Sequence, residues 1–198
     1  MTNPINWDQE PALAALRRAI DVTLVDPSEG EVLLRALIEK GSVHAMLHLG
    51  YLYAVRPKDA GGPDLCEAEH WYRMACEAGS PEATFYLGRL YLKTKSNDQA
   101  REAFEIGARR GYAPCLFHLG RIYRDGLGVE RRFALAREMF ERAASLDHLY
   151  AKRALGRMLL AGRFGFLGRF KGLRLVLVAA IDACKEIQKN PDSERLKI

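Results

Sequence analysis

The tripeptides HLG, YLG, HLG and ALG follow one another along the chain at similar intervals, and this recurrence constrains the fold more than any other feature. The copies end at Gly50, Gly88, Gly120 and Gly156, so the spacings are 38, 32 and 36 residues. Self-similarity with a period of about 20 to 50 residues is typical of solenoids, in which each repeat buries its apolar face against the next. The sequence therefore predicts a repeat architecture.

Other residue types recur at fixed distances from these glycines. Five residues before them stand small residues, namely Ala45, Ala83, Cys115 and Ala151. Three residues after them stand Tyr53, Tyr91, Tyr123 and, in the fourth copy, Leu159. These offsets share one face of a helix, and a glycine on that face lets a neighbouring helix approach closely. They define the first helix of each repeat.

A second helix follows each of the first three copies. The segments are AEHWYRMAC at 68–76, AREAFEIGA at 100–108 and AREMFERAA at 136–144. Aromatic and small residues recur in them every three to four positions, as in an amphipathic helix. Each repeat is thus predicted to be a pair of antiparallel helices.

The junctions carry helix-end signals. Gly41, Gly79, Gly111 and Asp147 stand nine residues before the repeat glycines. At the second junction Gly79 can end a helix, Ser80 can cap the next one and Pro81 suits its first turn. Capping boxes are expected for Asp64 with Glu67 and for Ser96 with Gln99.

At these residues the sequence resembles the SEL-one-like repeat family, a relative of the tetratricopeptide repeat. The best match is Cys115 to Asp147, where HLGRIYRDGLGV is followed by Ala136, Phe140 and Ala143. The resemblance covers about 30 to 185. The glycines in RDGLGV are expected to form a turn between paired helices, because no strand or third glycine at phosphate-loop spacing accompanies them.

The predicted fold is an all-α, right-handed α-solenoid of about four to five antiparallel helix pairs in a single repeat domain, 1–198. Residues 1–41 are expected to form N-terminal capping helices and residues 186–198 a C-terminal tail. The expected repeats are 42–79, 80–111, 112–147 and 148–185.

Resemblance to tetratricopeptide proteins implies a concave groove lined by positions −3, +1 and +4 from each repeat glycine. The predicted partner-binding residues are Tyr51, Phe85, Arg89, Phe117, Arg121, Arg124, Arg153 and Arg157. Arg89, Arg121 and Arg157 share the +1 position and would form a ladder of guanidinium groups suited to carboxylate or phosphate. The predicted function is non-enzymatic binding of an acidic peptide or protein surface, as adaptor, scaffold or regulator. The alternative is that these arginines form a solvated face.

Charge is unevenly distributed. Residues 1–88 hold 7 basic and 13 acidic residues, a net charge of −6, whereas 89–174 hold 19 and 8, a net charge of +11. The basic half suggests nucleic-acid binding as the alternative function, although exposed aromatic residues for base stacking are few. A protein partner is therefore preferred.

The segment LRLVLVAAIDAC at 173–184 is apolar on nearly every face, although a terminal repeat needs a polar outer side. Either the tail folds back over it, or it mediates self-association or partner binding.

Neither a cofactor nor a metal site is expected. His44, His48, Cys66 and His70 provide two pairs of possible zinc ligands, but antiparallel helices would separate them. The four cysteines are expected to be buried free thiols. No secretory signal or membrane span is evident, so a cytoplasmic location is expected.

Overall fold

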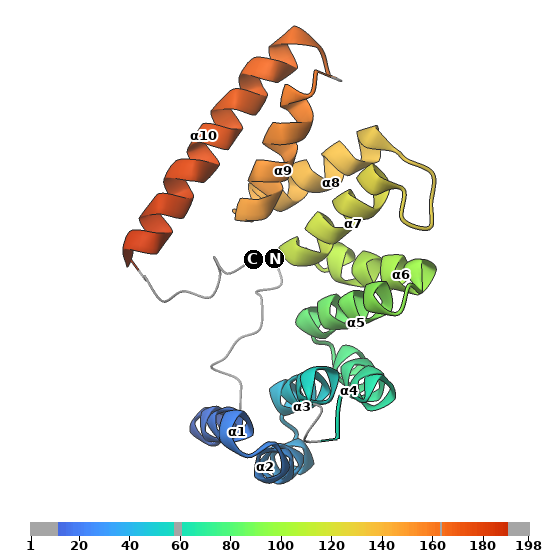
Figure 1. The fold of residues 1–198 in the computed structure, drawn as a ribbon, viewed down its shortest axis with the longest axis vertical. Helices are drawn as coiled ribbons and strands as arrows, with labels where there is room; N and C mark the ends of the chain where they lie inside the picture. The colour runs from blue at the N-terminus through green and yellow to red at the C-terminus, as the bar shows by residue number, and fades with distance from the viewer. Residues whose placement is uncertain (1–11, 58–60, 163, 190–198) are drawn as a thin grey trace. The chain divides into compact units, whose positions relative to one another are not determined.

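The computed structural model describes residues 12–57, 61–162 and 164–189. Within these ranges every regular element is an α-helix, and the predicted all-α solenoid is confirmed (Figure 1). The ten helices are α1 (Leu13–Val25), α2 (Pro27–Glu39), α3 (Val43–Val55), α4 (Leu65–Glu77), α5 (Pro81–Lys93), α6 (Asn97–Arg109), α7 (Ala113–Asp125), α8 (Phe133–Ser145), α9 (Leu149–Leu160) and α10 (Gly165–Lys189).

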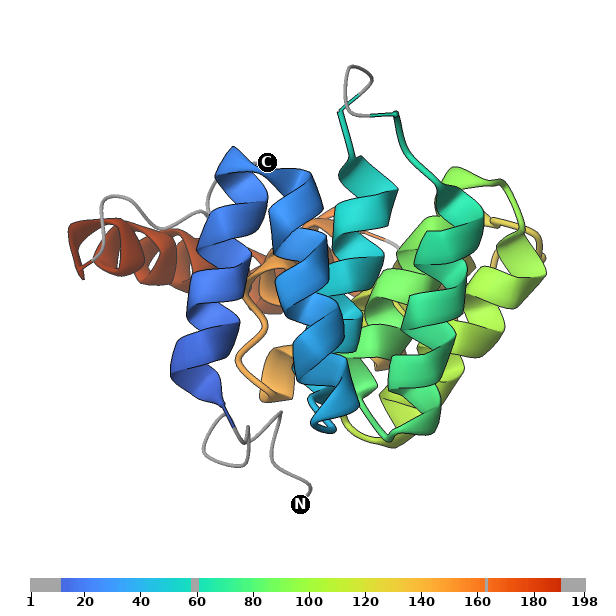
Figure 2. The ribbon, with the colours of Figure 1, turned by 90° about the horizontal axis from the view of Figure 1, so that it is seen from below.

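The helices form two compact units, residues 1–112 and 113–198, called here the N-terminal and C-terminal units. In the N-terminal unit α1 to α6 lie side by side in chain order (Figure 2). In the C-terminal unit α7 packs on α8, α8 on α9 and α9 on α10. Each unit therefore has the nearest-neighbour packing of a solenoid.

The repeat glycines lie where the two helices of a pair touch. A Cβ atom on Gly88 of α5 would lie 2.5 Å from the ring of Phe104 in α6, and one on Gly120 of α7 would lie 2.6 Å from Phe140 in α8. Phe104 and Phe140 are fully buried. The predicted role of these glycines in close helix packing is confirmed.

The helix-end signals are mostly confirmed. Gly79 has a φ of +94°, and Ser80 Oγ accepts a hydrogen bond from the Ala83 amide at 3.1 Å. The carboxylate of Asp64 caps α4, but Glu67 does not complete the box and instead accepts from the indole nitrogen of Trp71.

Two local predictions are wrong. Within the described residues no side-chain hydrogen bond caps α6, and Ser96 Oγ instead accepts from Thr94. Helix α10 extends to Lys189, whereas the sequence predicts a tail from residue 186. The remainder of that tail, 190–198, lies outside the described residues. No helix among the described residues is both long enough and apolar enough to cross a bilayer.

Candidate partner-binding site

A pocket of about 310 Å³ opens on the N-terminal unit between α3, α4 and α5. Three tyrosines, three aliphatic residues and two cations line it, namely Tyr51, Tyr72, Tyr86, Ala54, Val55, Leu90, Arg89 and Lys93. An apolar wall with a few polar groups is the usual character of a binding pocket.

The three tyrosines form one aromatic cluster. The rings of Tyr72 and Tyr86 stack with centroids 5.6 Å apart, and Tyr51 meets Tyr86 edge-on at 6.3 Å. Tyr72 is fully buried, Tyr86 half-buried and Tyr51 48% exposed. Burial raises the pKa of Tyr72 and of Tyr86, so both hydroxyls stay protonated at neutral pH. The cluster forms a rigid apolar wall with hydroxyl groups on it.

The two cations come from one face of α5. Arg89 lies over the ring of Phe85, with its guanidinium carbon 5.6 Å from the ring centroid, and Lys93 stands one turn further on. Both side chains are exposed. Neither forms an ion pair with any residue that the structure describes. Their charges are therefore available to an anionic group entering the pocket.

Three of the predicted site residues meet at this pocket. Tyr51 and Arg89 line it, and the ring of Phe85 lies against the Arg89 guanidinium. Sequence reasoning missed Tyr72, Tyr86 and Lys93. Tyr72 could have been found from the repeat pattern, because it lies in the second helix opposite the repeat glycine Gly50. A Cβ atom added to Gly50 would lie 2.8 Å from the Tyr72 ring.

In the C-terminal unit, two predicted site residues are engaged within the fold. Phe117 is half-buried in an aromatic cluster, with ring centroids 5.8 Å from Phe140 and 5.1 Å from His148. Arg124 binds its neighbour Asp125 through two hydrogen bonds of 2.7 and 2.8 Å. These hydrogen bonds are the main reason that the pKa of Asp125 is lowered. Arg124 is thus neutralised by its own helix.

The other three predicted arginines are more accessible. Arg153 and Arg157 of α9 are exposed, and Arg121 of α7 is half-buried. Arg121 lies close enough to Asp125 to help to lower the pKa of that carboxyl. Arg89 belongs to one unit and Arg121 and Arg157 to the other, so the arginine ladder stays a prediction.

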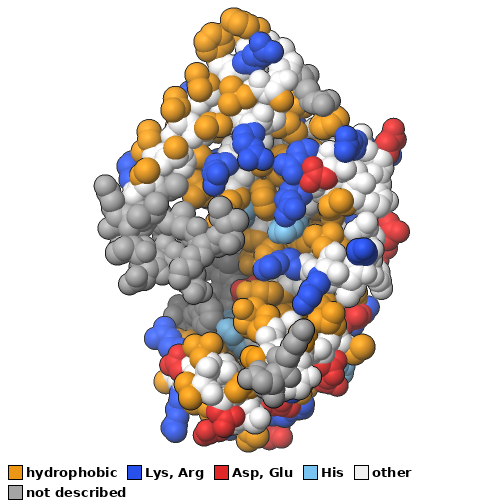
Figure 3. All heavy atoms as spheres, in the orientation of Figure 1, with side chains coloured by type: hydrophobic (Ala, Val, Ile, Leu, Met, Phe, Trp, Pro, Cys, Tyr) orange, Lys and Arg blue, Asp and Glu red, His pale blue; other side chains and the backbone are white. Residues whose placement is uncertain are grey.

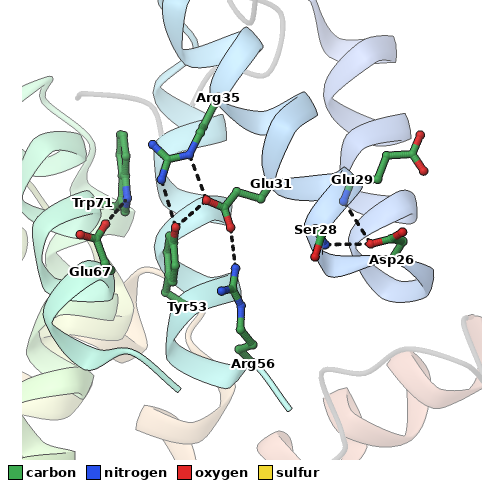
Figure 4. A network of polar contacts seen from close by, with 9 residues as sticks. All are labelled: Asp26, Ser28, Glu29, Glu31, Arg35, Tyr53, Arg56, Glu67 and Trp71. Carbon is green, nitrogen blue, oxygen red and sulfur yellow. Dashed lines mark hydrogen bonds and ion pairs between the residues drawn. The ribbon is translucent and has the colours of Figure 1, made fainter. Parts of the chain in front are cut away.

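A polar network joins consecutive repeats outside the pocket (Figure 4). In α2, Glu31 accepts hydrogen bonds from Tyr53 of α3 at 2.6 Å and from Arg56 at 2.6 Å, while Arg35 binds both Glu31 and Tyr53 at 3.0 Å. Arg35 also lies 5.3 Å from the ring of Trp71. Because these groups bind one another, we assign the network to stability.

The described residues contain no cluster of three or more His, Cys, Asp or Glu side chains that could hold a metal ion. All four cysteines are free thiols, but only Cys115 is buried. Cys66 and Cys184 are exposed, and Cys76 is half-buried. The expectation that all four are buried is therefore wrong.

Comparison with known families matches the Sel1 repeat model to residues 43–80 and 113–148, the segments that hold α3 with α4 and α7 with α8. The chain carries Sel1 repeats. The resemblance noted in the sequence is thereby confirmed, and the pocket lies between the first Sel1 repeat and α5.

Two curated relatives match part of this chain. Rat (Rattus norvegicus) DAP3-binding cell death enhancer 1 is 29% identical over 101 residues, and Candida glabrata ERAD-associated E3 ubiquitin-protein ligase component HRD3 is 27% identical over 116 residues. These matches cover 50% and 56% of this chain but only 20% and 14% of the relatives. The chain thus corresponds to a small part of each relative.

A solved Sel1 repeat protein from Oxalobacter formigenes has the same fold. It aligns with a TM-score of 0.72 at 20% identity and covers 95% of this chain and 85% of its own. This similarity shows that the chain has the helical solenoid fold of a Sel1 repeat protein.

Proposed function

We propose that the chain is a non-enzymatic protein-interaction module, and that the pocket on its N-terminal unit receives an acidic, partly apolar segment of a partner protein. The observation that carries the proposal is the placement of Arg89 and Lys93, both without ion pairs among the described residues, beside an aromatic pocket.

The chemistry of the pocket selects this class of ligand. The rings of Tyr51 and Tyr86, backed by the buried Tyr72, offer apolar surface to an aromatic or aliphatic side chain, with little loss of conformational entropy. The Arg89 guanidinium, oriented by Phe85, can bind a carboxylate through two parallel hydrogen bonds. Lys93 adds a second charge one helical turn away. A segment with one large apolar residue between acidic residues satisfies both halves of the pocket.

The relatives support a binding role. The name of the rat relative describes a protein that binds DAP3, and the yeast relative is named as a component of a ubiquitin ligase. Sel1 repeats generally mediate contacts between proteins. We extend this role to the present chain, with a partner defined by charge and apolarity.

The pairing of basic residues favours a protein partner over nucleic acid. In the basic region 89–174, several cations are neutralised within the fold: Arg101 by Glu105, Arg124 by Asp125, Arg137 by Glu141, and Lys152 by Asp147 and Asp182. Continuous phosphate binding needs many unpaired cations. The local pair Arg89 and Lys93 suits a short acidic segment better.

Selection from a random dodecapeptide library on the immobilised full chain tests the proposal. We expect enrichment of peptides that combine Asp or Glu with one large apolar residue. The double variant Arg89→Ala, Lys93→Ala should lose this enrichment. Arg109→Ala, which removes an exposed cation from α6 outside the pocket, is the matched control and should retain it. Selection of basic or uncharged peptides by the unaltered chain would refute the proposed ligand class.

A further inference from the structure

Helix α10 carries a stripe of exposed large apolar side chains along its length. The exposed residues are Phe166 at 71%, Leu167 at 83%, Phe170 at 61%, Leu173 at 49%, Leu177 at 55%, Val178 at 40% and Ile181 at 54%. Figure 3 shows hydrophobic side chains following the outer edge of this helix. With 25 residues, α10 is about twice as long as α9, its neighbour, which has 12.

The stripe faces away from the rest of the C-terminal unit. The opposite side of α10 packs on α9 through Gly172 and Val176, and Ala179 on that side is fully buried. A Cβ on Gly172 would lie 2.9 Å from the Leu159 side chain, and Val176 lies 2.7 Å from the Cβ position of Gly156. The seven exposed apolar residues of the stripe are therefore not needed for the contact between α10 and α9.

The spacing of the stripe indicates what can cover it. Four residues of the stripe continue into Ala180 and Cys184 as one line along the helix, namely Phe166, Phe170, Leu173, Leu177, Ala180 and Cys184, in alternating four- and three-residue steps. Ala180 and Cys184 are exposed like the others. Apolar residues in alternating steps of three and four form the seam of a coiled coil, which pairs with another α-helix.

The size gradient along this line makes it complementary to itself. When two copies of α10 run antiparallel about an axis between Leu173 and Leu177, Phe166 faces Cys184 of the other copy. Phe170 then faces Ala180, and Leu173 faces Leu177. Every layer joins a large residue with a small one, or two of middle size, as close packing requires. A parallel pair would instead place phenylalanine against phenylalanine and alanine against alanine.

We propose that α10 is a self-association surface whose occupant is the antiparallel α10 of a second copy of this chain. The contact is isologous, because the same stripe serves both copies. The seven exposed side chains offer on the order of 800 Å² per copy, the area of a standard stable interface. Arg174 borders the stripe, where its stem can cover apolar surface while its guanidinium stays in water.

Self-association through α10 is independent of the proposed pocket function, because the pocket lies in the other unit. A dimer would present two pockets in one particle. A partner with two acidic segments would then bind more tightly than either pocket alone allows, if its linker spans the two sites.

Light scattering coupled to gel filtration measures the predicted dimer. At micromolar concentration we expect twice the 22.3 kDa mass of one chain. Leu173→Glu with Leu177→Glu should give a monomer, because it places four carboxylates at the centre of the dimer. Val32→Glu on α2, whose side chain is 65% exposed, is the matched control and should remain dimeric. Circular dichroism checks that each variant keeps its helices. A monomeric unaltered chain would overturn the proposal.

Disulfide trapping measures the direction of the helices. In a Cys66→Ser background, Phe166→Cys should form an intermolecular disulfide with Cys184 under mild oxidation, and adding Cys184→Ser should abolish it. A disulfide between two copies of Cys184 before any change at Phe166 would indicate parallel helices and overturn the antiparallel arrangement.

Discussion

The hydroxyl of Tyr53 in α3 donates a 2.6 Å hydrogen bond to the carboxylate of Glu31 in α2, across the junction of two repeats. The same bond recurs one repeat later, where Tyr91 donates to Glu69 at 2.7 Å. In both places an arginine four residues after the glutamate binds the pair, Arg35 in one and Arg73 in the other. The tyrosine three residues after the repeat glycine thus joins its helix to the preceding repeat.

Removal of these tyrosine hydroxyls should destabilise the N-terminal unit. Tyr53→Phe and Tyr91→Phe each delete a hydrogen bond to a carboxylate, a loss of about 1 to 3 kcal/mol in the free energy of unfolding. Urea denaturation measures this loss. Tyr51→Phe, two residues from Tyr53 and with an exposed ring, is the control and should change the value by less than about 0.5 kcal/mol. Equal effects of Tyr51→Phe and Tyr53→Phe would contradict this role.

The same network predicts loss of stability in acid. Burial opposes ionisation of Glu31, but hydrogen bonds from Tyr53, Arg56 and Arg35 outweigh it and bring the pKa below its usual 4.5; the pKa of Glu69 is lowered similarly. A carboxylate with a lowered pKa contributes its full stabilisation above its unfolded pKa and loses it as pH falls through its folded pKa. The free energy of unfolding should therefore decrease below about pH 4.5.

Replacement of both glutamates isolates this effect. Glu31→Gln with Glu69→Gln should be less stable at pH 7, because the ion pairs are lost, and should show a shallower decline between pH 5 and about pH 3. Chemical denaturation across that range measures both quantities. Parallel pH profiles of the variant and the unaltered chain would show that the two carboxylates do not cause the decline.

His148 should give the C-terminal unit a separate pH dependence at higher pH. Burial lowers the pKa of His148 from 6.5 to about 4, and its Nδ1 caps α9 by accepting from the Ala151 amide at 3.2 Å. The unfolded chain therefore binds a proton first as pH falls. The contribution of neutral His148 to the free energy of unfolding is fully present above pH 6.5. It is lost as the pH falls from 6.5 to about 4, which lowers the free energy of unfolding by up to about 3 kcal/mol.

The variant His148→Asn tests this effect because asparagine can keep the cap without titrating. Its free energy of unfolding should vary less between pH 7 and pH 5 than that of the unaltered chain. An unchanged slope in this interval would assign the pH dependence to other groups.

The close approach at Gly88 should not tolerate a methyl group. Gly88→Ala places a Cβ 2.5 Å from the buried Phe104 ring, and the resulting overpacking should cost about 1 to 3 kcal/mol. Adding Phe104→Leu removes the clashing ring edge, so the double variant should be more stable than the sum of the single changes predicts. Additive effects in thermal denaturation would contradict direct contact between these two positions.

The repeat architecture was predictable because glycine, small residues and tyrosine each have a fixed structural role. Gly88 leaves room for the ring of Phe104, and Tyr91 donates a hydrogen bond to Glu69. The regular spacing of such residues in the sequence therefore follows from the packing of the repeats. The failed cap at Ser96 has a local cause. Lys95 adopts a positive φ of 61°, and Ser96 Oγ accepts from Thr94 instead of capping α6.

The candidate site was only partly predictable from the sequence. The position of a residue in a helix indicates which face its side chain lies on, but not which neighbouring side chain it binds. Two residues of the +1 position, Tyr51 and Arg89, line one pocket, and their role in partner binding stays a prediction. The same register could not show that Asp125 neutralises Arg124, since neighbouring side chains on a helix meet only in particular rotamers. Lys93 was missed because it lies outside the three positions that define the concave face.

We propose that Arg89 and Lys93 give the pocket a preference for acidic segments. Fluorescence anisotropy with a labelled peptide of glutamates around a single phenylalanine measures it directly. We expect Arg89→Glu with Lys93→Glu to weaken binding at least tenfold, as loss of charge-assisted hydrogen bonds implies, while Arg109→Glu changes the affinity less than about twofold. Equal affinities of the two variants would contradict the account.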